Sequence, residues 1–482
     1  MSLRRLLHIA GAVIGATGVA MFSAAIVGLM YQEWGDSLQI VLAAAIAIGI
    51  GGAMWKVFDR PGELTTREGF AAVGIAWLAM TFAGTLPFVL TGEISNFTDA
   101  FFETAAGFST TGSSILPDPG ALSHAILFWR SLTQWIGGMG IIVLSIAILP
   151  LLGVGGVQLA RAESPGVNPD RLTPRFAETA RRLWLIYIGF TGLEALFLWA
   201  GEMTLFEAVN HSFTTMSTGG FGTTSGSIGD FGAYTQWVVI VFMVIAGTSF
   251  ALHYKGLRSP LEYVRHPGFR LYALVLGVAA VVIAVGTWGT AIADTIRDAI
   301  FVSVTLVTTT GFGTADFGQW SVFLQIMAVG LMFIGGMAGS TSGSVKIYRH
   351  SILYQASRND LRRLIHPRGV FMPRWGKDPV SEAVVESVQS FFLLYMFAFM
   401  TGTALFGIII SASGSPFDIP STVSAVASAL GNIGPGLGAV GPASNFAAVP
   451  DLGKWLLALL MIVGRLEIFP IVLLFTRELW RR

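Results

Sequence analysis

An all-α polytopic membrane protein is the fold class that the sequence predicts, and three observations predict it. Of the 482 residues, 53% are apolar and only 12% are charged, which excludes an ordinary soluble domain. Apolar runs long enough to cross a bilayer recur along the chain with no polar domain between them. Four short apolar runs alternate with the long ones, and each runs into a glycine loop. We therefore expect one membrane unit.

Spanning helices need about 20 mostly apolar residues, whereas runs of roughly 10–14 are better interpreted as re-entrant. The sequence predicts long spans at 8–30, 38–55, 68–91, 122–152, 183–200, 232–253, 271–289, 320–348, 385–411 and 452–476. It predicts short segments at 99–108, 207–216, 298–307 and 421–430. Each short segment gives about 15 Å of helix, half of a roughly 30 Å hydrocarbon core, so it can enter the membrane without crossing it.

The order of long and short runs predicts four pseudo-repeats of outer helix, re-entrant pore helix with filter loop, and inner helix around one pore. Two extra helices precede them, and the first is too long for a signal peptide. The expected units are 1–64 for the extra helices, 65–160 for repeat one, 161–262 for repeat two, 263–378 for repeat three with a broken inner helix, and 379–482 for repeat four.

The four glycine loops form one series. They are TTGSS at 110–114, TGGFG at 218–222, TTGFG at 309–313 and NIGPG at 432–436, with central glycines Gly112, Gly220, Gly311 and Gly434. Thirteen residues before these glycines stand Asp99, Glu207, Asp298 and Ser421. An acid at the start of a helix accepts hydrogen bonds from free backbone N–H groups, so capping alone could explain the acids. The shared offset nevertheless places the four loops in one register.

A ring of backbone carbonyls is the chemistry that these loops can supply to a cation that has lost its water. Glycine permits the positive φ that aims successive carbonyls inward, and threonine adds hydroxyl oxygens. Packing of helices is an alternative for any one loop, but four copies in the same topological position favour a pore. The expected ion-binding residues are Thr110, Thr111, Gly112, Thr218, Gly219, Gly220, Thr309, Thr310, Gly311, Asn432, Ile433 and Gly434.

Charge and composition set further bounds. Lys and Arg gather in alternate loops, so both termini are expected in the cytoplasm and the glycine loops on the outer side, beneath an acidic vestibule. A net charge of +1 gives no indication of a nucleic-acid partner. The absence of cysteine excludes a disulfide scaffold and thiolate metal sites.

Two features below the glycine loops are candidates for a gate. The segment GGMAGSTSGS places Gly335, Gly336, Gly339 and Gly343 within the third inner helix, where they fit either close helix packing or an intramembrane loop. Arg465 lies in an apolar span, where a charge is costly. It fits either a structural ion pair or a fixed positive charge near the pore. Arg130 is a weaker candidate, expected to anchor filter loops or satisfy their carbonyls.

The chain resembles the Trk/Ktr/HKT superfamily of potassium transporters over essentially its whole length, and more closely the bacterial TrkH branch. The most specific pieces are TTGFG at 309–313, GGMAGSTSGSVK at 335–346 and GRLEIF at 464–469. The resemblance implies potassium as the transported substrate, without an organic cofactor in this chain. It implies potassium coordination at Thr110, Thr111, Thr218, Gly219, Thr309, Thr310, Asn432 and Ile433. It also implies that the glycine-rich segment and Arg465 form a gate. By the same resemblance, glycine at position 112 implies a preference for potassium over sodium.

The expected function is therefore gated, channel-like potassium uptake across a bacterial inner membrane, embedded in the lipid bilayer. A potassium symporter coupled to protons or sodium is the alternative, although the sequence offers few buried acids for a proton relay. An enzyme is not expected, because His211 and Glu103 share an offset but no nucleophile accompanies them. The resemblance further implies a homodimer and a TrkA-like cytosolic nucleotide-binding ring, for which the basic segment 346–377 is a candidate docking surface.

Overall fold

Long apolar helices dominate the computed structural model, which describes residues 2–58, 65–148, 172–289 and 291–476. Within these ranges six helices are long and apolar enough to cross a membrane: α1 (Leu3–Met30), α2 (Trp34–Val57), α3 (Thr66–Gly84) with its continuation α4 (Leu86–Thr91), α8 (Leu172–Trp199), α13 (Pro267–Gly286) and α17 (Glu382–Ser413). A bent pair, α10 (Ala233–Ala246) and α11 (Phe250–Gly256), adds a seventh if it counts as one span. The protein is a multi-pass membrane protein.

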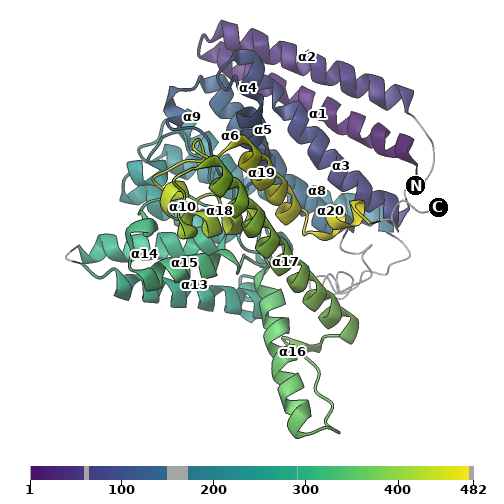
Figure 1. Cartoon of the computed structure of the whole chain (residues 1–482), viewed down its shortest axis with the longest axis vertical. Coiled ribbons are helices and arrows are strands. Elements are labelled where there is room, and N and C mark those ends of the chain that lie inside the picture. The colour runs from purple at the N-terminus through teal and green to yellow at the C-terminus, as the bar shows by residue number, and fades with distance from the viewer. Residues whose placement is uncertain (1, 59–64, 149–171, 290, 477–482) are drawn as a thin grey trace.

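The first two helices form a separate hairpin along one edge of the molecule (Figure 1). They pack backbone to backbone, because a Cβ on Gly51 would stand 2.6 Å from the carbonyl oxygen of Gly11. A Cβ on Gly18 would likewise stand 2.9 Å from the carbonyl oxygen of Ala44. Small residues at such positions let helices approach closely in a membrane, which explains a tight hairpin with an apolar outer surface.

Four repeats follow, each with a short pore helix between an outer and an inner helix. The pore helices are α5 (Phe97–Phe108), α9 (Leu205–Met216), α14 (Ile292–Val307) and α18 (Ile419–Gly431). The inner helices are α6 (His124–Ile148), the α10–α11 pair, α15 (Val322–Met332) and α19 (Asp451–Arg465), which is followed by α20 (Phe469–Leu474). A 3-10 turn lies after each glycine loop: η1 (Pro119–Ala121), η3 (Ser227–Asp230), η4 (Phe317–Gln319) and η5 (Gly438–Val440). This order confirms the predicted architecture.

Three of the predicted inner spans are interrupted. The span expected at 232–253 bends by 101° between α10 and α11, at Gly247 to Ser249. The helix expected at 320–348 ends at Met332, and no helix resumes until Ile347. The span at 452–476 breaks after Arg465, where Glu467 and Ile468 have φ values of 56° and 64°. The break in the third repeat was predicted from its glycines. Hydropathy could not locate the other two breaks, because apolar residues lie on both sides of them.

The cytoplasmic side of the predicted topology carries one projection. Helix α16 (Ile347–Ile365) and one end of α17 extend away from the helical body (Figure 1). Between them lies an antiparallel pair of two-residue strands, β1 (Arg374–Trp375) and β2 (Asp378–Pro379). A short helix, α12 (Leu261–Arg265), precedes α13. The predicted boundary at 160/161 and the basic residues at 161–171 and 477–482 lie outside the described residues.

Candidate ion pathway

The four residues that stand thirteen positions before the central glycines differ in role, and one of them also differs in its place in the pore helix. Asp99, Glu207 and Ser421 are each the third residue of their pore helix, whereas α14 begins earlier and puts Asp298 in its second turn. Only Glu207 completes a capping box, with Thr204. Asp99 accepts from the Lys454 ammonium at 2.6 Å, and the Ser421 hydroxyl accepts from the Ala439 amide at 3.0 Å. Capping therefore explains one of the four.

Each glycine loop is tied to its own pore helix by the same pair of hydrogen bonds. In the first loop the amide of Thr110 donates to Gly107 O and that of Thr111 to Ala106 O, both at 2.9 Å. The amides of Thr218 and Gly219, Thr309 and Thr310, and Asn432 and Ile433 donate to the corresponding carbonyls of α9, α14 and α18. These bonds satisfy carbonyls that the end of a helix leaves without intrahelical partners. They also direct the loop amides toward the pore helices.

Backbone conformation alternates in the same way in all four loops. Thr110, Thr218, Thr309 and Asn432 have φ values between 52° and 59°. Two residues later Gly112, Gly220, Gly311 and Gly434 have φ values of 81°, 76°, 82° and 110°. A positive φ at threonine is a genuine outlier and costs on the order of 1–3 kcal/mol, so such residues persist only where the surrounding structure imposes them. Three equivalent threonine outliers, with Asn432 in the same conformation in the fourth loop, point to a shared function.

The central glycines close the loops into a ring. A Cβ on Gly112 would lie 2.0 Å from Gly219 O, one on Gly220 would lie 2.0 Å from Thr310 O, and one on Gly311 would lie 1.8 Å from Ile433 O. The fourth contact returns to the first loop, with Thr111 O lying 2.9 Å from a Cβ on Gly434. In every case the facing carbonyl belongs to the residue before the neighbour's central glycine. The four loops therefore meet in the order one, two, three, four.

A cavity of about 150 Å³ adjoins this ring on the side of the segments that follow the loops. All four central glycines line it, together with residues of the segments that follow the loops. The volume is enough for several water-sized particles, or for a cation with part of its hydration shell. Of the twelve predicted ion-binding residues, the four central glycines line this cavity and the other eight do not. The structure thus brings the first and fourth central glycines to one space, although they are more than 300 positions apart in the chain.

The predicted acidic vestibule is only partly realised. The residues that line the cavity include no Asp or Glu, and their one charged side chain is that of Arg130. Acids of the outer loops serve local structure instead: Asp118 caps η1, Asp316 caps η4 and Asp418 caps α18. A carboxylate that accepts hydrogen bonds from backbone N–H groups of a turn is directed toward those groups and not toward the cavity. Sequence counts of acids therefore overstate the charge at the entrance.

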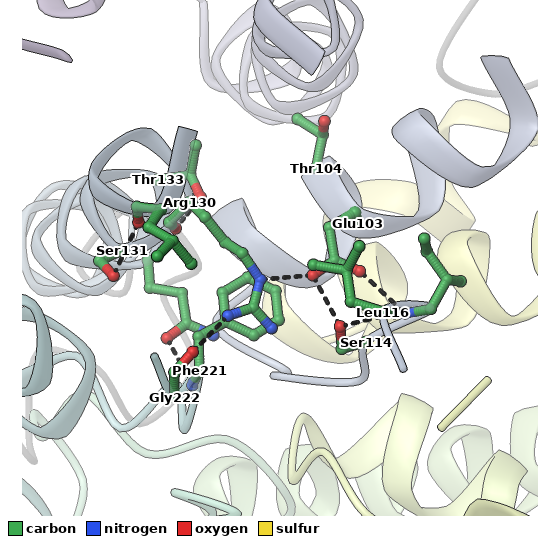
Figure 2. A network of polar contacts seen from close by, with 12 residues as sticks. Glu103, Thr104, Ser114, Leu116, Arg130, Ser131, Thr133, Phe221 and Gly222 are labelled. Carbon is green, nitrogen blue, oxygen red and sulfur yellow. Dashed lines mark hydrogen bonds and ion pairs between the residues drawn. The ribbon is translucent and has the colours of Figure 1, made fainter. Parts of the chain in front are cut away.

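Arg130 joins the first two repeats beside the cavity (Figure 2). Its Nε donates to Glu103 Oε1 of α5 at 2.6 Å, and its Nη1 donates to Gly222 O in the second glycine loop at 2.8 Å. The guanidinium lies 3.6 Å from the centre of the Phe221 ring. Glu103 also accepts from the Ser114 hydroxyl and the Ile115 amide, each at 2.9 Å. Arg130 therefore anchors the second loop to the first pore helix.

Gln134, one helical turn after Arg130, was not among the sequence candidates. Its Nε2 donates to Gly219 O at 2.7 Å, and its Oε1 accepts from the Phe221 amide at 3.1 Å. Its side chain is fully buried. A signal was present in the sequence, since FWRSLTQW puts polar residues four apart, on one face of an otherwise apolar helix. That arrangement indicates a polar partner inside the bundle.

Beneath the ring, residues 333–346 form a non-helical segment, which we call the inner loop. Its Gly343 amide donates to the Thr309 hydroxyl at 2.7 Å, directly below the third glycine loop. A Cβ on Gly343 would lie 2.4 Å from Gly431 O, and one on Gly336 would lie 2.7 Å from Gly247 O. Gly335 and Gly339 have φ values of 74° and 75°. The four glycines thus serve an intramembrane loop, and two of them also allow close backbone contact.

Thr341 in the inner loop contacts two other repeats. Its hydroxyl lies 3.1 Å from Met216 O at the end of α9 and 3.2 Å from Ala246 O at the end of α10. Its own carbonyl accepts from Nη1 of Arg465, at the end of α19, at 2.6 Å. Nη2 of the same arginine lies 3.4 Å from Gly137 O of α6. Arg465 is 2% exposed, and no carboxylate pairs with it among the described residues. The described residues therefore give no support to the ion-pair alternative for Arg465.

Glu467 forms ion pairs with two other basic residues. One carboxylate oxygen lies 2.5 Å from Nη2 of Arg349, and the other lies 3.6 Å from Nζ of Lys346. Lys346 ends the inner loop and Arg349 is in the first turn of α16. The break between α19 and α20 is thus bound electrostatically to the exit of the inner loop.

Comparison with known proteins agrees with this architecture. The sequence model of the family described as TrkH, cation transport protein, matches residues 36–481. The chain is 39% identical to the Trk system potassium uptake protein TrkH of Salmonella typhimurium, over 100% of both chains. It is 33% identical to the Trk system potassium uptake protein TrkG of Escherichia coli, over 98% of both chains. The crystal structure of the potassium transporter TrkH from Vibrio parahaemolyticus superimposes with a TM-score of 0.90 at 36% identity, over 100% of both chains. The chain therefore belongs to the TrkH family of cation transport proteins.

Proposed function

We propose that this protein takes up potassium across the bacterial inner membrane through the ring of glycine loops. The single observation that carries the proposal is the closed ring, in which each central glycine abuts a carbonyl of the next loop around one cavity. The similar proteins are named potassium uptake proteins, which supports potassium as the substrate. The transported ion is the substrate, and the proposal includes no organic cofactor and no enzymatic step.

Ion binding in this proposal uses the loop carbonyls. Potassium leaves part of its water in the outer cavity and meets oxygens of Thr110, Thr111, Thr218, Gly219, Thr309, Thr310, Asn432 and Ile433. The central glycines Gly112, Gly220, Gly311 and Gly434 provide the backbone geometry. Each pore helix points its carboxyl end at the ring, and the negative end of its dipole favours a cation there.

Passage below the ring is controlled by the inner loop. Gly335, Gly336, Gly339 and Gly343 give it a backbone that other residues would not adopt or fit. Arg465 holds Thr341 O and adds a positive charge that repels a cation at this level. Uptake then requires the inner loop and Arg465 to separate. The gate is thus a contact between repeats three and four.

Coupled symport with protons or sodium is the second candidate, and flux measurements distinguish it. Purified protein in vesicles should take up potassium under an imposed membrane potential, at a rate that does not depend on a proton or sodium gradient. Gly311→Ser should lose preference for potassium over sodium under the same conditions. A rate that follows the proton or sodium gradient would establish symport, and unchanged selectivity in Gly311→Ser would refute the filter.

The unit boundaries that we propose are 1–64, 65–160, 161–262, 263–378 and 379–482, with both termini in the cytoplasm.

We further propose a homodimer with a pore in each protomer and a TrkA-like nucleotide-binding ring on the cytoplasmic side. The exposed basic residues of the α16–β2 projection support a docking site there: Arg358, Arg362, Arg363, Arg368, Arg374 and Lys377. Crosslinking of single cysteines introduced at this projection, in native membranes, would test the partner.

A further inference from the structure

Glu194 is a carboxyl group inside the membrane unit to which no part of the ion pathway assigns a role. It lies in α8, five residues before the outer end of that helix, and its side chain is fully buried. Neither carboxyl oxygen has a hydrogen-bond partner among the described residues, and no ion pair includes it there.

An isolated carboxylate in such a place is unfavourable. Moving an unpaired charge out of water costs so much that the group takes up a proton and becomes neutral instead. Ionisable residues inside membrane spans are also rare, and they mark ion or proton sites by default. A carboxyl group in this position therefore requires either a counterion or a proton, and the described residues supply no counterion.

The helices around Glu194 carry several charged and titratable groups. Helix α8 packs against α6, α9, α10 and α11. Their titratable and charged groups are His124 and Arg130 on α6, Glu207 and His211 on α9, Tyr234 on α10, and His253, Tyr254 and Lys255 on α11, with Glu178, Arg181, Arg182 and Tyr187 on α8 itself. None of these forms an ion pair with Glu194 in the described part of the chain.

Three of these groups have partners of their own. Arg130 pairs with Glu103, and Nε2 of His211 lies 3.1 Å from the Thr223 hydroxyl. The Tyr187 hydroxyl donates to Trp135 O at 3.1 Å. Since each of them already binds another group, none neutralises an ionised Glu194.

What Glu194 does face is the carboxyl end of the second pore helix. Its carboxyl group lies near Thr215, whose hydroxyl donates to His211 O at 2.7 Å. The backbone carbonyl of Thr215 accepts from the amide of Thr218, and Thr214 O accepts from Gly219, both at 2.8 Å. These two bonds set the start of the second glycine loop. A negative charge beside them would oppose the negative end of the pore-helix dipole.

We propose that Glu194 is a proton-binding site, neutral in the folded protein, whose ionisation displaces the second glycine loop. The exchange is simple: the carboxylic acid releases a proton and leaves a carboxylate beside Thr215. The proton site itself does not depend on the proposed transport function. Its effect on the second glycine loop rests on that function.

Infrared spectroscopy tests the proton site directly. The spectrum of wild type minus Glu194→Gln, in membranes near neutral pH, should contain the carbonyl stretch of a protonated carboxylic acid, with a small shift in heavy water. Glu207→Gln is the matched control, since Glu207 is a solvent-accessible acid in the capping box of α9, the pore helix that Glu194 faces. Its difference spectrum should contain carboxylate bands only. Carboxylate bands alone for Glu194→Gln would overturn the proposal.

Potassium flux tests the effect on the loop. Glu194→Gln mimics the protonated side chain, so it should match wild-type uptake at neutral pH. As the pH rises into the alkaline range, wild-type uptake should fall while uptake by Glu194→Gln stays constant. Parallel curves would refute the link between the proton and the loop. Absence of potassium uptake in both proteins at neutral pH would instead refute the proposed transport function and leave the infrared result standing.

Discussion

The carbonyl oxygen of Ile433 lies 1.8 Å from the point where a Cβ on Gly311 would stand, and Gly311 itself has a φ of 82°. No side chain fits this contact without displacement of the fourth loop, because the obstructing atom belongs to the backbone. Steric exclusion and backbone conformation therefore demand glycine independently. The same two requirements hold at Gly112 and Gly220, where the distances are both 2.0 Å.

We predict that Gly311→Ser reduces selectivity for potassium over sodium. Backbone strain of this kind is on the order of 1–3 kcal/mol, which corresponds to a change of roughly 5- to 150-fold in relative ion binding. Ion-resolved flux through the purified protein measures it. Gly330→Ser is the matched control, since Gly330 of α15 has no atom within 4 Å of its Cβ position. If both variants lose selectivity alike, the ring contact is not the cause.

Gly434 should tolerate alanine better than Gly311 does. The facing carbonyl lies at 2.9 Å, about one ångström farther than the corresponding carbonyls at the other three loops. A small shift of the fourth loop could relieve that contact, although the φ of 110° still imposes strain. Thermal unfolding and selectivity of Gly434→Ala and Gly311→Ala, measured side by side, should rank Gly311→Ala as the more damaged. The reverse order would contradict the ring geometry.

Arg130→Met should destabilise the folded protein strongly. Removing one partner of a buried ion pair costs about 3–5 kcal/mol, because the other charge is left unpaired. Adding Glu103→Gln to Arg130→Met should recover part of that loss, which a double-mutant cycle on unfolding free energies would reveal. Arg182→Met is the control, because Arg182 pairs with Glu178 at the surface and such pairs contribute about 0–1 kcal/mol. Equal effects of the two arginine variants would exclude this role.

Arg465→Ala should raise potassium uptake in the absence of any activating partner. The variant loses the hydrogen bonds to Thr341 O and Gly137 O. Only the bond to Thr341 O holds the inner loop. A hydrogen bond to a charged group contributes about 1.5–3 kcal/mol, so the inner loop should open roughly 10- to 150-fold more often. Arg297→Ala removes a cation that pairs only with Asp294 on its own helix among the described residues, and it should leave uptake unchanged. A rate below that of wild type would argue against Arg465 as part of the gate.

Asp418→Ala should destabilise the fourth pore helix in a pH-dependent way. The hydrogen bonds from the side chain and backbone of Ser421 lower the pKa of Asp418. A lowered pKa gives stability that is present above the unfolded pKa, about 3.9, and is lost as the pH falls. Loss of a helix cap costs about 0.5–2 kcal/mol. The difference in melting temperature between wild type and variant should thus be largest near neutral pH and shrink at about pH 4 and below. A difference independent of pH would exclude the ionised cap.

The repeating register made the glycine loops predictable, because the offset of thirteen residues recurs regardless of what packs around it. Gln134 was not predictable as a loop contact, since its partner Gly219 is 85 positions away. The bend after Ala246 depends on a contact between chain segments, in which the Met337 amide donates to Gly247 O at 2.9 Å. Asp298 was misplaced as a helix start because α14 begins six residues earlier, at a residue without a side-chain cap. Local pattern thus predicts repeats, and long-range contacts decide where helices break.

The ring also constrains the order in which the protein can mature. Its last contact joins Gly434 to Thr111, and the Ser113 hydroxyl donates to Gly434 O at 2.9 Å across 321 positions. During synthesis the first three glycine loops leave the ribosome well before their fourth neighbour exists. A chain that lacks the fourth loop would place an incomplete pore in the bilayer, through which ions could leak. Insertion of the fourth repeat, which closes the ring, would then be the step that stops ion leakage and so preserves the membrane potential of the cell.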